Sequence, residues 1–79
     1  MRVRVRLFAG LRESVGTGEL VQELPAGSTV RALVDRLVEQ YPALGTRRCM
    51  FAVNSTYVTP QVELHDGDEV ALIPPVGGG

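Results

Sequence analysis

The chain has 79 residues and a mass of 8.5 kDa, which suffices for one small domain but not for a core divided between two domains. Hydrophobic residues make up 44% of it, charged residues 22%, and the formal net charge is −1, so it has a globular composition without the basic surface that nucleic-acid binding requires. A single cysteine, Cys49, excludes an intrachain disulfide and a cysteine-rich zinc site.

The first predicted strand covers residues 2–7, where arginine alternates with an apolar residue. A period of two places Val3, Val5 and Leu7 on one face of the strand and the arginines on the other. Phe8 continues the arginine face. We expect its ring either to be covered by the next segment or to await a partner.

That next segment, residues 10–16, predicts a short helix because it is bracketed by glycines and carries Leu11 and Val15 four positions apart. Residues 19–24 then predict a second strand. Pro25 ends this strand and begins a turn.

The clearest helical pattern runs from Val30 to about Tyr41, because apolar residues recur there at the spacing of one helix face. Those residues are Val30, Leu33, Val34, Leu37 and Val38. Ser28 or Thr29 supplies the N-terminal cap, and Pro42 ends the helix. We expect the following residues, through Arg48, to form a polar connection.

The C-terminal part predicts two more strands and a short extended piece. Residues 49–54 form the third strand, and a turn at Asn54-Ser55 leads into residues 57–58. A tight turn at residues 66–68 precedes the last strand, residues 69–73. Alternation within that strand places Ile73 on the outward face, as it does Phe8 in the first strand.

The order strand, strand, helix, strand, strand indicates an α+β roll with one main helix packed across a mixed sheet. We expect the first strand to form a hairpin with the second and to pair in parallel with the last. This arrangement is the β-grasp, or ubiquitin-like, fold. It assigns residues 1–75 to the domain and residues 76–79 to a flexible C-terminal tail.

Side chains that could act as catalysts are few. His65 lies in a turn and is expected to be exposed, and Cys49 is expected to be a small buried residue although Arg47 and Arg48 precede it. The carboxylates at residues 66–69 have the pattern of a hairpin turn rather than of a metal site. The alternating arginines of the first strand are expected to form a solvated face, and the absence of lysine excludes a lysine Schiff base.

The closing glycines after Pro74-Pro75 allow two interpretations. They form either a disordered end or a side-chain-free arm that carries a reactive carboxylate into a partner's active site. The apolar runs are far below the ~20 residues of a membrane span. We therefore expect no membrane span, no signal peptide and a cytoplasmic location.

Several stretches resemble the MoaD/ThiS family of β-grasp sulfur carriers, and together they extend nearly from end to end. They are Leu7-Phe8-Ala9-Gly10-Leu11-Arg12-Glu13, Ala52-Val53-Asn54, Asp66-Gly67-Asp68-Glu69-Val70, Pro74-Pro75-Val76 and Gly78-Gly79. The first of these motifs and the Pro-Pro-Val segment are typical of the molybdopterin branch of the family. Gly77 departs from that branch, which often has Thr or Ala there.

The resemblance implies that the chain acts through its C-terminal carboxylate, without a catalytic side chain, bound metal or permanently bound cofactor. A ubiquitin-activating-like adenylyltransferase would adenylate Gly79 with ATP, and sulfur from a sulfur donor protein would then replace AMP to give a thiocarboxylate. The large subunit of molybdopterin synthase would receive the tail and deliver the sulfur to cyclic pyranopterin monophosphate. Neither a nucleic acid nor a membrane is implied as a partner.

Partner binding is assigned to outward apolar residues and to the tail. The residues are Phe8, Tyr57, Ile73, Pro75, Val76, Gly77 and Gly78. Two alternatives stay open: a carrier that supplies sulfur to another acceptor, such as thiazole, a tRNA base or an amino acid, and a ubiquitin-like binding module without chemistry.

Overall fold

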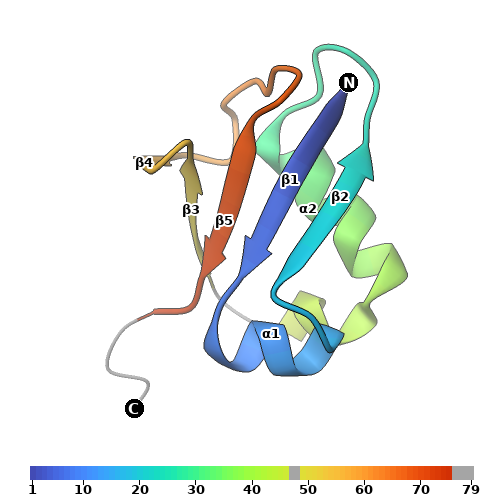
Figure 1. Ribbon diagram of the computed structural model, residues 1–79, viewed down its shortest axis with the longest axis vertical. Coiled ribbons are helices and arrows are strands. Elements are labelled where there is room, and N and C mark those ends of the chain that lie inside the picture. The colour runs from blue at the N-terminus through green and yellow to red at the C-terminus, as the bar shows by residue number, and fades with distance from the viewer. Residues whose placement is uncertain (47–48, 76–79) are drawn as a thin grey trace.

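The computed structural model describes residues 1–46 and 49–75, in which a five-stranded mixed sheet curls around one long helix (Figure 1). The elements are β1 (Arg2–Leu7), α1 (Ala9–Val15), β2 (Glu19–Glu23), α2 (Val30–Gln40), the 3-10 helix η1 (Pro42–Thr46), β3 (Met50–Val53), β4 (Thr56–Val58) and β5 (Glu69–Ile73). None of these helices is long and apolar enough to cross a lipid bilayer.

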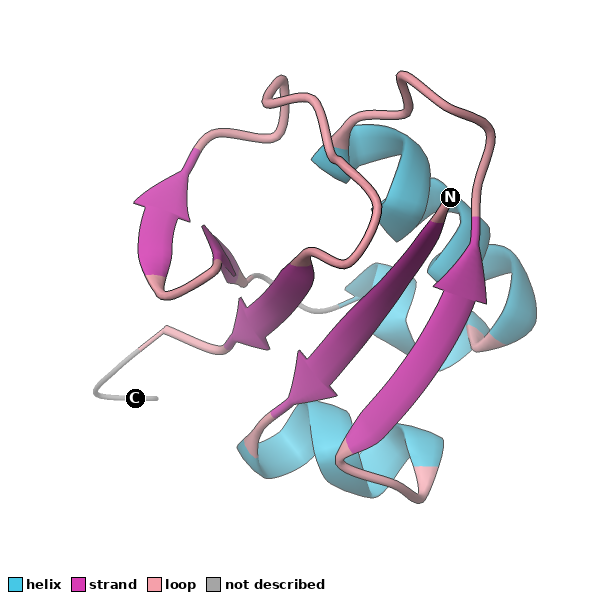
Figure 2. Cartoon of the chain, turned by 45° about the horizontal axis from the view of Figure 1, so that its top comes forward, coloured by secondary structure: helices cyan, strands magenta, loops and turns pink. Residues whose placement is uncertain are grey.

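The strand order across the sheet is β2-β1-β5-β3-β4, with β1 antiparallel to β2 and parallel to β5. This topology confirms the predicted β-grasp fold. The parallel register sets Leu7 opposite Leu72, so β1 and β5 end at the same edge of the sheet. At this edge α1 connects the end of β1 to β2 (Figure 2).

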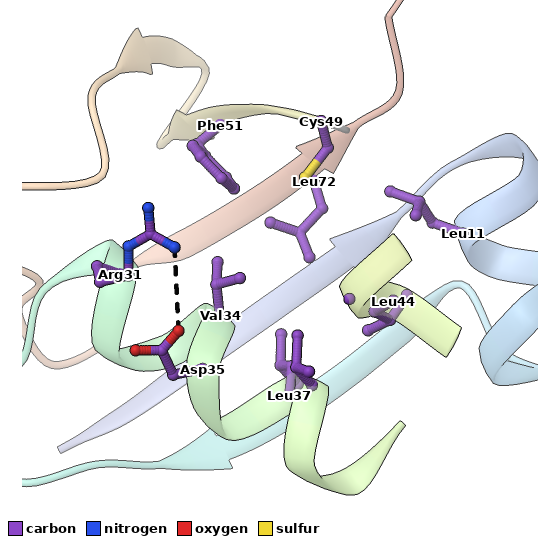
Figure 3. A pocket seen from close by; sticks show the side chains of 11 residues that line it. Leu11, Arg31, Val34, Asp35, Leu37, Leu44, Cys49, Phe51 and Leu72 are labelled. Atoms are coloured by element: carbon purple, nitrogen blue, oxygen red, sulfur yellow. Dashed lines mark ion pairs between the residues drawn. The ribbon is translucent and has the colours of Figure 1, made fainter. Parts of the chain in front are cut away.

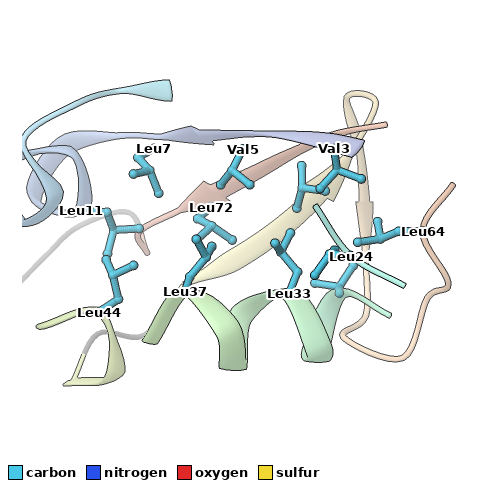
Figure 4. Packing of buried hydrophobic residues seen from close by; sticks show 12 residues of the cluster. Val3, Val5, Leu7, Leu11, Leu24, Leu33, Leu37, Leu44, Leu64 and Leu72 are labelled. Atoms are coloured by element: carbon cyan, nitrogen blue, oxygen red, sulfur yellow. The ribbon is translucent and has the colours of Figure 1, made fainter. Parts of the chain in front are cut away.

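The core lies between the inner face of the sheet and α2 (Figure 4). Burial along β1 alternates as predicted, with the arginines exposed and the apolar residues buried. The side chains buried from β1, α2 and β5 are Val3, Val5, Leu7, Val30, Leu33, Leu37, Val70 and Leu72. Val34 and Val38 pack against this cluster but stay partly exposed, because they lie at the margin of the apolar stripe of α2.

Helix α2 begins at the second of its two predicted caps. The Thr29 hydroxyl accepts a hydrogen bond from the Ala32 N–H at 3.2 Å, which satisfies a donor of the first turn. The Ser28 hydroxyl instead donates to the Pro25 carbonyl at 2.7 Å and closes the preceding turn. The helix ends at Gln40, two residues before Pro42.

The connection after α2 differs from its prediction. It contains η1, whose Leu44 is buried near Leu11 and Leu37 (Figure 4). The predicted polar character was therefore wrong for this residue, because α1 and α2 together form an apolar site that one leucine fills. Residues 47–48, which complete the connection, lie outside the described residues.

Candidate functional site

Four large apolar side chains in the described part of the chain remain exposed, and they share one face of the molecule. They are Phe8 (40% exposed), Val21 (52%), Met50 (41%) and Tyr57 (65%). Pairing register places the strand residues on the face opposite α2, which we call the outer face. Phe8 follows β1 with an extended backbone, φ −126° and ψ 154°, and so continues the outward alternation that was predicted.

A shallow hollow of about 240 Å³ lies on the outer face and gathers three of the predicted partner-binding residues, Phe8, Tyr57 and Ile73. The register sets Ala52 opposite both Ala71 and Tyr57. Two alanines side by side leave space between larger neighbours, so they line the hollow with little side-chain bulk. We call this feature the apolar hollow.

Phe8 and Ile73 differ in exposure. Leu11 and Val15 of α1 turn toward the core, with Leu11 only 1% exposed, so the helix does not cover the Phe8 ring. Ile73 points outward as predicted but is partly covered within the hollow. Both contribute apolar surface to one site, as adjacent ends of β1 and β5 require.

Charged side chains border the apolar hollow along β1. The Glu69 carboxylate forms ion pairs with two arginines: Arg4 Nη2 lies 3.5 Å and Arg6 Nη1 lies 3.9 Å from its oxygens. The Arg6 guanidinium carbon also lies 5.7 Å from the centroid of the Phe8 ring, within the range of a cation–π contact. The predicted solvated arginine face is therefore a polar rim along one side of the hollow.

The chain leaves the sheet beside the apolar hollow. Ile73 is the last residue of β5 and lines the hollow, and Pro74 and the exposed Pro75 follow directly. Proline cannot continue the ladder, so the strand stops here. Residues 76–79, which include the predicted partner-binding Val76, Gly77 and Gly78 and the predicted reactive Gly79, lie outside the described residues.

Cys49 lies on the other side of the sheet, in a cavity of about 460 Å³ between α2 and β3 (Figure 3). The cavity walls are mostly apolar, with an Arg31–Asp35 ion pair of 4.0 Å at its border. Burial raises the pKa of the half-buried Cys49 thiol above its ordinary 9.0, because the thiolate loses hydration. The thiol is therefore protonated at neutral pH, as suits a small packing residue and not a nucleophile.

His65 and the nearby carboxylates form turns, as predicted. The His65 side chain is 75% exposed, and the backbone N–H of His65 donates to the Asp68 carboxylate at 2.8 Å. Asp66 accepts from the Arg2 N–H at 2.7 Å. Within residues 1–46 and 49–75, no group of three His, Cys, Asp or Glu side chains is arranged to hold a metal ion.

Met50 was not assigned a role from the sequence. It lies opposite Ile73 and extends the apolar surface. Asn54 forms the predicted turn that leads to Tyr57, and its side chain donates to Asp68, which the sequence did not predict. Alternation within residues 49–54 would have placed Met50 and Ala52 on one face. Their position beside β5, however, depends on a register that the sequence pattern does not specify.

Comparisons with known proteins agree with the β-grasp fold described above. The model of the ThiS family matches residues 5–79. The chain is 42% identical over 83 residues to a molybdopterin synthase sulfur carrier subunit of Chlamydomonas reinhardtii, covering 100% of both chains. It is 41% identical over 83 residues to the protein of the same name from Escherichia coli K12, covering 98% of this chain and 99% of that one.

Among solved structures, a putative molybdopterin converting factor subunit 1 from Pyrococcus furiosus superposes with a TM-score of 0.90 at 32% identity. The match covers 96% of this chain and 99% of that one.

Proposed function

The chain belongs to the ThiS family, and we propose that it is the sulfur carrier subunit of a molybdopterin synthase. The observation that carries the proposal is the full-length similarity to curated sulfur carrier subunits. The chemistry of the described residues supports it, because a half-buried, protonated thiol and a solvated turn histidine give this domain no activated nucleophile of its own. A carrier needs none, since its partners supply the catalytic groups.

We place the reactive group at the Gly79 carboxylate, which the family match includes. A carboxylate becomes an acyl donor only after activation. In our proposal an adenylyltransferase partner uses ATP to form the acyl-adenylate and release pyrophosphate, and a sulfur donor protein then replaces AMP with sulfur. No cofactor resides on the carrier, and the reactions take place in the cytoplasm, where a single free thiol stays reduced.

We assign docking to the apolar hollow and its margin. Phe8, Tyr57 and Ile73 line the hollow, and Pro75 stands where the chain leaves it. Apolar anchors surrounded by charged residues have the composition of a protein interface. A partner seated there lies beside the start of residues 76–79, so docking and entry of Gly79 into the partner's active site occur together.

The proposal is tested by reconstituting the synthase. The chain is first converted to its thiocarboxylate and then mixed with the large subunit and cyclic pyranopterin monophosphate. We expect a dithiolene-containing pterin, and no product from a chain that lacks Gly79. A thiocarboxylated chain that binds its partner but leaves the pterin unchanged would assign the carrier to another acceptor, the alternative left open by the sequence.

A further inference from the structure

A second hollow adjoins the apolar hollow and differs from it in chemistry. It measures about 320 Å³ and is lined by Arg6, Leu7, Phe8, Ala9, Arg12, Thr17, Gly18 and Glu19. Arg6 and Phe8 border both hollows, so the two form one continuous surface at the end of β1. We call the second one the polar hollow.

Charge in the polar hollow is not balanced. Arg12 is exposed and forms no ion pair or side-chain hydrogen bond with the residues that the structure describes. The one ion pair of Arg6 among the described residues is the long 3.9 Å contact with Glu69, whose carboxylate it shares with Arg4. Glu19 is the one carboxylate among the lining residues, so the lining of the polar hollow combines two arginines with one carboxylate.

Arg12 lies close to the backbone of Gly18. A Cβ at Gly18 would lie 3.3 Å from Arg12 Nε and 3.5 Å from Cζ, so the guanidinium lies against backbone where another residue would have a side chain. The planar fork of arginine fits the two oxygens of a carboxylate, and this shape is pre-organised in the side chain itself.

We propose that Arg12, supported by Arg6, binds an aspartate or glutamate side chain of the large subunit when that subunit docks on the apolar hollow. This inference rests on the proposed function and adds a specific charged contact to it. The apolar hollow beside Arg12 points to a protein surface as the occupant, and aspartate and glutamate supply the planar pair of oxygens that the arginine fork fits. The contact fixes the orientation of the large subunit, because a charged contact at Arg12 beside an apolar contact in the hollow defines the register in which the two surfaces meet.

Calorimetry with the purified large subunit tests the contact in the full chain. We expect Arg12→Ala to weaken binding about tenfold and to reduce its dependence on salt, measured between about 50 and 500 mM. The affinity of Arg12→Lys should lie between those of the wild type and Arg12→Ala, because lysine keeps the charge without the planar fork. Arg2→Ala is the matched control: Arg2 lies at the other end of β1, paired with Glu23, and its loss should change affinity less than about twofold.

Gly18→Ala provides a test that preserves all charges. Its methyl group would lie 3.3 Å from Arg12 Nε, so the guanidinium has to shift slightly, and we expect a smaller loss of affinity than in Arg12→Ala while circular dichroism stays unchanged. If Arg12→Ala fails to fold, this variant and Arg12→Lys decide the question. Normal affinity in folded Arg12→Ala, or in both other variants, would overturn the inference.

Two further results separate this inference from its alternatives. Wild-type protein that does not bind the large subunit would refute the proposed function and this contact with it, whereas wild-type binding that is indifferent to Arg12 refutes the contact alone. Inorganic phosphate is titrated while the Arg12 Nε–H resonance is followed by NMR. Saturation below about 1 mM, a typical range for a specific small-anion site, would assign the hollow to phosphate and overturn the carboxylate; no saturation there supports the carboxylate.

Discussion

At the scale of single residues, two side chains that could act as a nucleophile or a base are Cys49 and His65. Cys49 has a half-buried thiol whose pKa is raised by loss of hydration, and His65 is solvated in a turn. Burial disfavours the reactive thiolate form of Cys49, and the ion-pair partners of His65 are the carboxylates of Glu63 and Asp68. We therefore expect sulfur transfer to proceed without the side chains of Cys49 and His65.

Replacing Cys49 by serine tests this directly. We expect Cys49→Ser to form the thiocarboxylate at the wild-type rate while losing about 1–2 kcal/mol of unfolding free energy, because a hydroxyl is buried less favourably than a thiol. Mass spectrometry measures the first quantity and urea denaturation the second. A folded variant that no longer carries sulfur would make Cys49 a relay in the transfer.

The raised pKa also predicts how stability depends on pH. Above the ordinary thiol pKa of 9.0, the unfolded chain releases the Cys49 proton more readily than the folded chain does. The free energy of unfolding must therefore fall as the pH rises through that value. The difference between wild type and Cys49→Ser, followed by denaturation from neutral to alkaline pH, isolates this contribution from the tyrosines, and a difference independent of pH would contradict it.

At the scale of elements, the turn between β3 and β4 positions part of the proposed docking surface. Asn54 has φ +49°, and its side chain donates to Asp68 Oδ1 at 2.8 Å and accepts from the Glu69 N–H at 3.0 Å. These bonds join the β3–β4 hairpin to the start of β5. Tyr57 belongs to this hairpin and lines the apolar hollow, so the hydrogen bonds of Asn54 help to hold Tyr57 in place.

Removing the Asn54 side chain should loosen this connection. We expect Asn54→Ala to lower the free energy of unfolding by about 1–3 kcal/mol, because it loses both hydrogen bonds and places alanine in the left-handed region. Ser55→Gly is the control, since Ser55 has φ +72° and glycine adopts that conformation without strain. Urea denaturation compares them; equal stability of Asn54→Ala and wild type would show that the turn needs no such clamp.

Most elements could be predicted from local patterns, and the exceptions have physical reasons. Alternation specified β1 and β5, helical spacing specified α2, and turn residues bounded the strands. The 3-10 helix η1 was missed because Leu44 is a single large apolar residue in the short segment between Pro42 and Gly45. Its burial arises from contacts with α1 and α2, which no local pattern records.

The outer face was predictable in part. Phe8 and Ile73 could be paired because their strands were expected to lie side by side, and the structure places them in one hollow. The two alanines that line the hollow meet because of the strand register. The place of the Arg12 guanidinium depends on a close approach to the backbone of Gly18. Those features arise from tertiary packing, so they required the structure.

At the scale of the whole molecule, the domain presents one surface beside one end of the chain. β1 and β5 run in parallel and finish together, so the apolar hollow and the last described residues share an edge of the sheet. The opposite face is filled by α2 and the core (Figure 4). The fold thus separates the core from the proposed docking surface.

A charge placed in the apolar hollow tests this division. We expect Ile73→Glu to weaken binding to the activating enzyme and to the large subunit by about 2–4 kcal/mol, since a buried carboxylate would lack a partner. Val21→Glu is the control, because Val21 is exposed on β2 of the same face but does not line the hollow. Calorimetry with both partners, and circular dichroism, give the readout; unchanged affinity would remove the hollow from the interface, and unfolding would place Ile73 in the core.

The central claim is that Gly79 carries the sulfur, and intact-mass spectrometry tests it most directly. The chain is incubated with the activating enzyme, ATP and a sulfur donor, beside a variant extended by one residue after Gly79. We predict a mass increase corresponding to one oxygen replaced by sulfur, located at Gly79 by fragmentation and absent from the extended variant. An unchanged wild-type mass under conditions in which the enzyme consumes ATP with the chain, or sulfur found on Cys49 instead, would contradict the account.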